Sequence, residues 1–316
     1  MKLKTSTFKG TTELTLLGSF IVMVIFFSLF APYFFTIRNF LNIGLYSSII
    51  GISAVGMTMV LLLGHIDVSV GAIMGLVGVL AALFFKTGLH MSVVFPLIIL
   101  TGMVAGLLNG ILVTKMRISS LIVTLATMTI FRGFGYVFCG GLSIVITANS
   151  CRYLGRGYVI GLPFAFIIMI TLYILFTYIL KNTSFGRRIY ATGGNTEASY
   201  FSGINVDRIT ILVFSLTGVL AALAGLVMAS QTGSGQPRAG QGYEMSVITA
   251  VVLGGTSLKG GKGKLLGTLI GIFIMVTLTN GMVLMNIPSF YQEIAKGCVL
   301  LLAVIIDSIR TRKSPA

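Results

Sequence analysis

Few side chains in this chain of 316 residues could carry out acid–base, nucleophilic or metal chemistry. The acidic residues and histidines are Glu13, Asp67, Glu197, Asp207, Glu244, Glu293 and Asp307, with His65 and His90. They form no HExxH motif and no closely spaced carboxylate pair, which a hydrolytic metal centre or a general acid–base pair would need. The sequence therefore predicts a protein that is not an enzyme and holds no metal site.

Two further kinds of chemical site are not indicated. The segment GGTSLKGGKGK at 254–264 has the composition of a phosphate-binding loop, but neither Lys262 nor Lys264 is followed by Ser or Thr, as G-x-x-x-x-G-K-[ST] requires. We interpret it as a tight turn between helices, so the chain binds no nucleotide or other cofactor itself. The three cysteines form no CxxC motif. The sequence leaves open whether Cys139 and Cys151 form a disulfide.

The elements that position these residues must lie in lipid. The chain is 56% hydrophobic and 9% charged, whereas soluble domains carry about 25% charged residues. A bilayer-spanning helix needs roughly 20 apolar residues, and the N-terminal apolar run is too long for a signal peptide. The sequence predicts an all-α, polytopic membrane protein in a single transmembrane domain, 1–316. About ten helices are expected, at 14–34, 45–63, 68–85, 91–114, 119–138, 160–180, 209–230, 245–258, 265–285 and 291–309.

The distribution of basic residues predicts the orientation. The net charge is +15, and because the basic residues lie in short loops, we attribute it to the positive-inside rule and not to nucleic-acid binding. With the N-terminus inside, fifteen basic residues are cytoplasmic: Lys2, Lys4, Lys9, Lys115, Arg117, Lys181, Arg187, Arg188, Arg208, Lys259, Lys262, Lys264, Arg310, Arg312 and Lys313. Five are external: Arg38, Lys86, Arg152, Arg156 and Arg238. Both termini and the loop 181–208 are therefore expected in the cytoplasm.

Asp67 has two interpretations. It lies in GHIDVSVG at 64–71, and only Asp67 and Glu293 are expected to enter the membrane. Such a residue could bind a proton or sodium ion, with His65 as the nearest partner in sequence. Alternatively Asp67 caps the next helix, with Ser69 as a second short polar group, because such side chains accept first-turn N–H groups. We favour the cap.

A few polar residues in the apolar runs are candidates for a path across the membrane. Asn109 and Asn280 are the strongest of these, because a buried amide must find hydrogen-bond partners. Ser and Thr side chains more often bond their own helix backbone. We assign Asp67, Ser69, Asn109 and Asn280 to a candidate translocation path.

Three long segments resemble one family of membrane proteins. AVGMTMVLLLGHIDVSVGAIMGL at 54–76, TSFGRRIYATGGNTEASYFSGINV at 183–206 and ITAVVLGGTSLKGGKGKLLGTLIG at 248–271 are similar, in order and separation, to permease subunits of bacterial ABC importers of simple sugars, of the ribose, xylose and galactose type. The resemblance covers nearly the whole chain. His65 departs from it, since many members have Gly there, and Val68 replaces the commoner Leu.

This resemblance implies a fold and a set of partners. It implies a type II ABC importer permease in the bacterial inner membrane, paired with a second permease chain that is identical or related. It also implies a cytoplasmic ABC ATPase, which binds ATP and magnesium, and an extracytoplasmic sugar-binding protein. Two alternatives from other classes remain, an ion-coupled carrier of a small polar solute and a channel or scaffold. The sequence does not name the sugar.

The resemblance also places a short coupling helix, the contact with the ATPase, in the loop 181–208. Its residues are Asn195, Thr196, Glu197, Ala198, Ser199, Tyr200, Phe201, Ser202 and Gly203. Asn195 or Thr196 suits the N-cap and Gly203 the C-terminal stop. A two-turn helix is unstable alone, so we expect Tyr200 and Phe201 to anchor it in a partner groove. The alternative is a helix lying against lipid.

Overall fold

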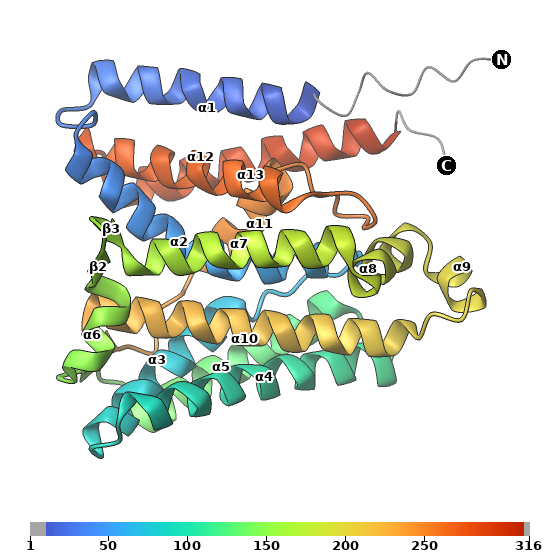
Figure 1. Ribbon diagram of the computed structural model, residues 1–316, viewed down its shortest axis with the longest axis horizontal. Coiled ribbons are helices and arrows are strands. Elements are labelled where there is room, and N and C mark those ends of the chain that lie inside the picture. The colour runs from blue at the N-terminus through green and yellow to red at the C-terminus, as the bar shows by residue number, and fades with distance from the viewer. Residues whose placement is uncertain (1–10, 313–316) are drawn as a thin grey trace.

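A computed structural model describes residues 11–312 of the chain, which fold into a bundle of helices (Figure 1). Ten longer apolar helices follow one another along the chain. They are α1 (Thr11–Phe30), α2 (Ile37–Leu62), α3 (Val70–Lys86), α4 (Met91–Lys115), α5 (Ser120–Cys139), α7 (Phe164–Asn182), α10 (Val206–Thr232), α11 (Tyr243–Leu253), α12 (Leu265–Leu284) and α13 (Ser289–Arg312).

Several short elements join these helices. Three are helical: α6 (Asn149–Arg156), α8 (Ser184–Gly194) and α9 (Thr196–Phe201). Two antiparallel pairs of two-residue strands also form, β1 (Ile144–Val145) with β4 (Ser234–Gly235), and β2 (Tyr158–Val159) with β3 (Leu162–Pro163). The strand pairs are too small to change the fold class, which is the polytopic helical class that the composition predicts.

The number of membrane spans depends on helix length. Among the described residues, seven helices are long and apolar enough to cross a membrane: α2, α4, α5, α7, α10, α12 and α13. Three apolar helices are shorter than these seven: α3, α11 and the segment Leu14–Phe30 of α1. Each of the ten expected segments thus contains an apolar helix, but α3 and α11 have 17 and 11 residues and need not cross the bilayer alone.

Helix ends differ from the sequence prediction where capping was not recognised. The second helix was expected from residue 45 but begins at Ile37, because the Thr36 hydroxyl accepts the N–H of Asn39 at 3.2 Å and caps it. The eighth was expected to reach 258, but α11 ends at Leu253, before Gly255 with φ +89°. The turn predicted at 254–264 is present, and Gly255, Gly260, Gly261 and Gly263 within it adopt positive φ values.

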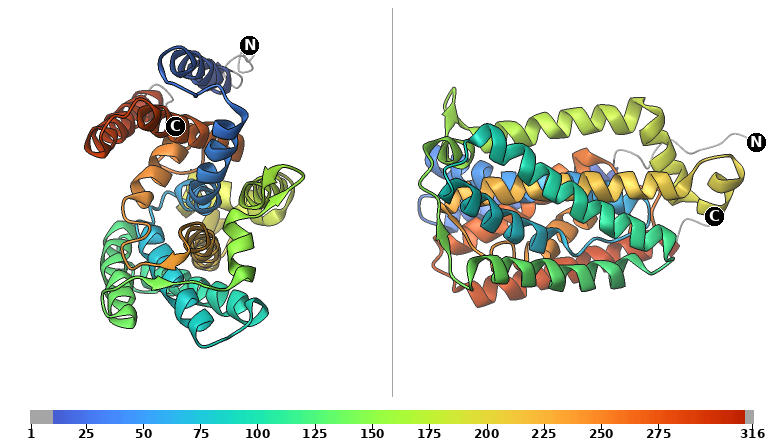
Figure 2. Two further views of the ribbon diagram at one scale, coloured as in Figure 1. Left: turned by 90° about the vertical axis from the view of Figure 1, so that its left-hand side faces the viewer. Right: turned by 90° about the horizontal axis from the view of Figure 1, so that it is seen from below.

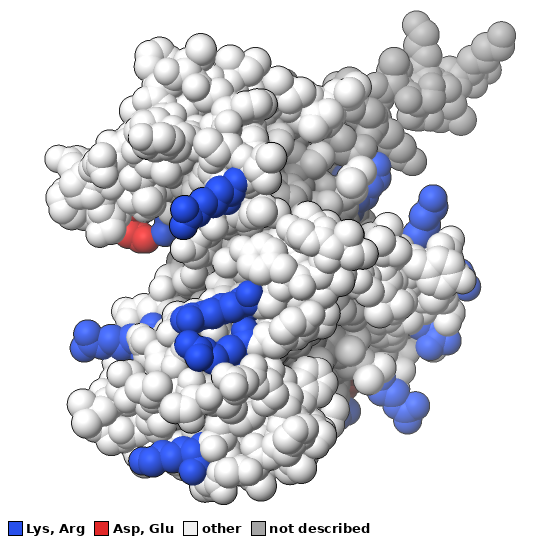
Figure 3. All heavy atoms as spheres, turned by 60° about the vertical axis from the view of Figure 1, so that its left-hand side comes forward, with Lys and Arg blue, Asp and Glu red and all other residues white. Residues whose placement is uncertain are grey.

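The bundle has two distinct ends. The long helices lie roughly side by side (Figures 1 and 2). One end, here the α9 end, holds α8, α9, the first described turn of α1 and the last of α13; the other, the α6 end, holds α6 and the strand pairs (Figure 1). Lysine and arginine side chains gather towards the two ends, with uncharged surface between them (Figure 3). This distribution is typical of a protein whose middle lies in hydrocarbon.

Two interruptions in the helices lie inside the bundle. After α2, the loop 63–69 leads to α3, and Asp67 and Ser69 within it are fully buried. After α10, the loop 233–242 runs along α3, where Gly75 meets the carbonyl oxygens of Pro237 and Ala239 so closely that a side chain there would clash. Irregular backbone at membrane depth is tolerated only when protein or a water-filled cavity surrounds it. The two loops therefore mark the interior where polar groups can gather.

Candidate functional site

The short helix α9 has the ends that its sequence predicts. The Asn195 side chain caps it by accepting the N–H of Ala198 at 2.8 Å. Gly203 follows the last turn with φ +80°, a conformation that side chains disfavour. The N-cap and the glycine stop are confirmed, whereas the coupling role of residues 195–203 stays a prediction.

Two aromatic side chains project from α9. Tyr200 is 69% and Phe201 79% exposed, although their ring centroids are only 5.8 Å apart. Glu197 is also exposed, and Ser199 is the buried residue of this helix. Both rings are therefore available for contact with a partner or with lipid.

Sequence reasoning missed the helix α8, which connects α9 to the rest of the bundle. Its tyrosine, Tyr190, donates a hydrogen bond to the carbonyl of Gly263 at 2.9 Å. At its C-terminal end Gly193 packs directly on the carbonyl of Leu62, which also accepts the N–H of Gly261 at 2.8 Å. These contacts hold α8 close to the end of α2 and to the loop 254–264. The approach is so close that a side chain at Gly193 would not fit. The glycine pair GG at 193–194 was the available signal.

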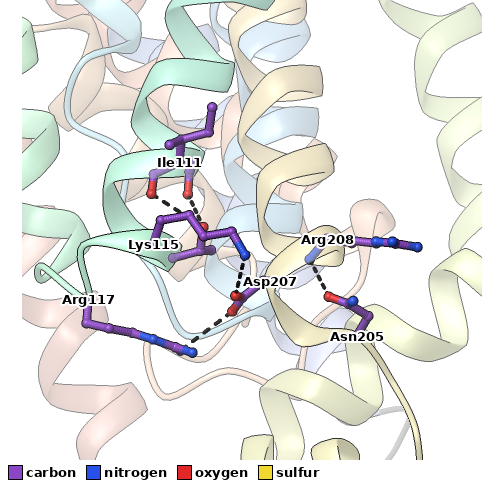
Figure 4. Close-up of polar contacts among 8 residues, drawn as sticks. Ile111, Lys115, Arg117, Asn205, Asp207 and Arg208 are labelled. Carbon is purple, nitrogen blue, oxygen red and sulfur yellow. Dashed lines mark hydrogen bonds and ion pairs between the residues drawn. The ribbon is translucent and has the colours of Figure 1, made fainter.

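A charged cluster ties the start of α10 to the end of α4 (Figure 4). Asp207 contacts Lys115 at 3.1 Å and Arg117 at 3.5 Å. Both basic side chains are well exposed, and exposed ion pairs contribute only about 0–1 kcal/mol. Asn205 caps α10 by accepting the N–H of Arg208 at 3.0 Å. The cluster therefore aligns the chain that follows α9 more than it stabilises the fold.

Three of the four predicted path residues form one buried cluster. The Asp67 Oδ1 accepts the N–H of Ser69 at 2.9 Å and its hydroxyl at 2.6 Å. Asn109 on α4 donates from Nδ2 to the Ser69 hydroxyl oxygen at 2.8 Å. Asp67 Oδ2 and Asn109 Oδ1 have no hydrogen-bond partner within the described part of the chain. The cluster joins the interruption before α3 to α4.

The capping hypothesis for Asp67 needs correction. The N-cap of α3 is Ser69, and its side chain makes no capping hydrogen bond. Asp67 instead closes a local turn two residues earlier, because its carboxylate accepts the N–H and the hydroxyl of Ser69 and no N–H group within the helix. Its proposed partner, His65, has its ring 6.0 Å from that of Phe214.

The fourth path residue, Asn280, lies elsewhere. Its amide exchanges two hydrogen bonds with Asn39, at 3.0 and 2.9 Å. Asn280 also lines a cavity of about 420 Å3 between α2, α11, α12 and α13, together with Tyr46, Gln241, Tyr243, Glu293 and Lys296. Asn280 therefore belongs to a second polar region, apart from the cluster around Asp67, and the assignment of all four residues to a translocation path stays a prediction.

Sequence reasoning also missed a buried carboxylate. Glu244, at the start of α11, is only 8% exposed, and its Oε1 accepts the N–H of Gly242 at 3.1 Å. Its Oε2 lies against Gly71 of α3 and has no hydrogen-bond partner among the described residues. Among the described residues, Glu244 thus joins Asp67 as a buried acidic residue, whereas Glu293 is exposed. The signal for Glu244 was its position directly before the apolar run 245–253.

The cysteine question is resolved by packing. Cys139, Cys151 and Cys298 are all free. Cys151 lies in α6 at the α6 end, where burial raises the pKa of its thiol to about 11. Cys139 and Cys151 therefore form no disulfide with each other, and the Cys151 thiol is protonated at neutral pH.

Comparisons with known proteins agree with this architecture. The family model described as "Branched-chain amino acid transport system / permease component" matches residues 39–304. "Ribose import permease protein RbsC" of Haemophilus influenzae is 43% identical over 98% of this chain and 98% of its own length. RbsC of Bacillus subtilis is 45% identical over 92% and 91% of the two chains.

A more distant relative and the structural comparison complete the result. The "L-arabinose ABC transporter permease protein AraH" of Azospirillum brasilense is 39% identical over 94% of this chain and 88% of its own. No solved structure matches. Because the family model and these relatives cover nearly all of its length, the chain belongs to the family of ABC-importer permease components that includes the ribose import permeases.

Proposed function

We propose that this permease subunit translocates a simple sugar, a ribose-like pentose or related monosaccharide, into a bacterial cell. The curated relatives that match it over nearly its whole length are named as ribose and arabinose permeases. An ABC ATPase would bind ATP and magnesium on the cytoplasmic side, and an extracytoplasmic binding protein would deliver the sugar. The ion-coupled carrier is not favoured, because the relatives are named as ABC-importer components.

The single observation that carries the coupling mechanism is the exposed pair Tyr200 and Phe201 on α9. Such a pair can anchor the helix in a groove of the ATPase. Movement of α9 would pass through α8 to the end of α2, where Gly193 touches Leu62. It would also pass through the start of α10, where Asp207 meets Lys115 of α4. Both routes lead to helices that border the buried polar cluster.

The orientation follows from the charges at the two ends. Loops and helix ends at the α9 end carry Lys115, Arg117, Lys181, Arg187, Arg188, Arg208, Lys259, Lys262 and Lys264. Those at the α6 end carry Arg38, Lys86, Arg152, Arg156 and Arg238. This bias supports a cytoplasmic α9 end in an inner-membrane protein. The residues 1–10 and 313–316 lie outside the described part, so the cytoplasmic location of both termini rests on the sequence.

Two polar regions would serve the translocation path. The cluster of Asp67, Ser69 and Asn109 lies at the loop that interrupts the helices before α3. The cavity beside Asn280 is lined in part by the loop before α11. The ion pair of Glu293 with Lys296 at 2.6 Å borders the cavity. Charged residues in membrane helices face protein or water and not lipid. We infer that the cavity between α2, α11, α12 and α13 faces an aqueous path, which a second permease chain would complete.

The test removes the aromatic pair from α9. We expect the Tyr200→Ala plus Phe201→Ala double variant to insert normally, because neither residue packs in the bundle, but to co-purify with less ATPase. Uptake of radiolabelled D-ribose by proteoliposomes holding permease, ATPase and binding protein should fall at least tenfold.

A matched control is available at the other end of the molecule. Phe290 and Tyr291 are also an exposed adjacent pair, with ring centroids 4.8 Å apart. The Phe290→Ala plus Tyr291→Ala variant should retain the ATPase. If both variants assemble at wild-type yield, α9 is not the coupling element. If the wild-type assembly imports neither D-ribose nor L-arabinose, the proposed sugar class is wrong whatever α9 does.

A further inference from the structure

Two adjoining cavities lie between α7 and α12 near the α9 end. One, of about 660 Å3, is enclosed by the last turns of α7, by α8 and by the first turn of α12. The other, of about 450 Å3, continues between α7 and α12 towards the middle of the bundle. Because both are lined by Thr177, Lys181 and Leu266, they form one continuous depression, which we call the α7–α12 groove.

The end of the groove at α8 is basic. Lys181, Arg187 and Lys264 line it, and no acidic side chain of the described residues does. Lys181 has no ion pair within residues 11–312, and Arg187 makes only a 3.4 Å hydrogen bond to the carbonyl of Asn182. Lys181 and Arg187 thus converge without an ion pair among the described residues, which favours an anion, and phosphate accepts hydrogen bonds from both kinds of side chain. This end of the groove is therefore suited to a phosphate group.

The basic end has a defined shape. The Thr183 hydroxyl caps α8 by accepting a hydrogen bond from the N–H of Gly186 at 3.3 Å. It also donates a hydrogen bond to the carbonyl oxygen of Ile179 at 2.7 Å. Gly186 lies so close to the carbonyl of Leu180 that no side chain fits there. Tyr190 lines the cavity and binds Gly263 through its hydroxyl. These contacts hold Arg187 and Lys181 on the same side of the bend between α7 and α8.

The remainder of the groove is apolar and has the length of a lipid chain. Its lining includes Ile170, Ile174, Leu266 and Leu269. From residue 170 to 182 the α7 backbone rises about 18 Å at 1.5 Å per residue, which exceeds half of a hydrocarbon core about 30 Å thick. Tyr173 also lines it, and its buried hydroxyl has no hydrogen-bond partner among the described residues. A hydrocarbon tail would match this apolar lining, and the buried Tyr173 hydroxyl is not accessible to it.

We propose that the α7–α12 groove binds an anionic phospholipid. Its phosphate lies between Lys181 and Arg187, and one acyl chain follows α7 past Tyr173. A free phosphate would leave the apolar part empty, and an acidic peptide would not match a groove open to the bilayer along α7, whose Ile174 and Tyr178 are exposed. Basic pockets between membrane helices are known to select anionic headgroups. Because α8 leads directly into α9, the bound lipid would help to hold the coupling segment.

The test measures lipid retention by the assembled transporter. We would reconstitute it in nanodiscs of phosphatidylcholine with a minor fraction of phosphatidylglycerol, extract it gently and count bound lipids by native mass spectrometry. The wild type should retain phosphatidylglycerol in preference to phosphatidylcholine. The Lys181→Gln plus Arg187→Gln variant should retain at least fivefold less at the same lipid composition.

The control variant changes the same net charge at the same end. Lys259 and Lys262 are exposed in the loop 254–264 and line neither cavity, so Lys259→Gln plus Lys262→Gln should retain lipid as the wild type does. A second groove variant, Ile174→Trp, should also lower retention by filling the apolar part. Equal retention in all variants would overturn the proposal.

Two other outcomes would replace the lipid with a different ligand. Competition by millimolar inorganic phosphate would show an anion pocket that does not depend on the acyl chain. Loss of the ATPase from the Lys181→Gln plus Arg187→Gln variant, with lipid retention unchanged, would show that these residues bind an acidic surface of that partner. Neither readout requires sugar transport, so the result is independent of the proposed function.

Discussion

At the residue scale, the most informative side chain is Asp67. A buried carboxylate without a basic partner at membrane depth is costly and usually functional. Here one carboxylate oxygen accepts two hydrogen bonds from Ser69, and Ser69 in turn accepts one from Asn109. This arrangement uses the acceptor capacity of Asp67 to hold the chain before α3. It does not require the charge.

Asp67→Asn should therefore retain most transport. The asparagine Oδ1 can accept the same two hydrogen bonds, and its amide nitrogen replaces an oxygen that has no partner in the described structure. Asp67→Leu should instead lower stability by about 1–3 kcal/mol, because it leaves a buried N–H unsatisfied. Sugar uptake and the thermal unfolding midpoint of the purified assembly measure the two effects. Abolished uptake by a fully folded Asp67→Asn variant would instead show that the charge itself takes part in transport.

At the element scale, glycines decide how closely helices pack. Along one face of α4, Gly102, Gly106 and Gly110 meet the backbone of α10. At Gly106 an added Cβ would clash with the carbonyl oxygen of Phe214. In lipid, such small faces allow close helix approach, and association depends on van der Waals packing. This contact also positions Asn109, which lies between two of these glycines.

Gly106→Ala should therefore destabilise the permease by about 1–3 kcal/mol, since the new methyl group has no space. Gly133 on α5 offers a matched control, because nothing lies within 4 Å of an added Cβ there. Gly133→Ala should be neutral or slightly stabilising, as Ala favours helices. The thermal unfolding midpoints of both variants in the same detergent provide the measurement. Equal midpoints would mean that α4 and α10 can move apart without cost.

At the scale of the whole molecule, the two ends of the bundle differ in what they present. The α9 end carries an exposed aromatic pair, a basic groove and the cluster around Asp207. The α6 end carries the short helix α6 and the two strand pairs. An importer needs such asymmetry, because its energy source and its cargo arrive on opposite sides of the membrane.

Single-cysteine labelling in intact cells tests the orientation. Ser184 begins α8 at the α9 end and Thr87 follows α3, which ends towards the α6 end; both are exposed. In a background without the natural cysteines, a membrane-impermeant thiol reagent should label Thr87→Cys and spare Ser184→Cys. Permeabilised cells should label both, which serves as the control. The reverse pattern would invert the orientation and place α9 on the wrong side for a cytoplasmic ATPase.

Local chemistry made several features predictable from sequence. The apolar runs locate the helices because each must cover its own backbone hydrogen bonds in lipid. The ends of α9 follow from Asn195 and Gly203, since capping and positive φ are properties of single residues and their neighbours. The family resemblance in three segments agrees with the family model over residues 39–304.

Tertiary structure alone decided which polar residues meet. Asn109 and Ser69 are forty positions apart, and nothing local indicates that one bonds the other while Asn280 bonds Asn39. The burial of Glu244 against Gly71 and the groove between α7 and α12 likewise depend on segments distant in sequence. The physical reason is that helix propensity and hydrophobicity act within a few residues, whereas a buried polar group finds its partner only after the helices have packed.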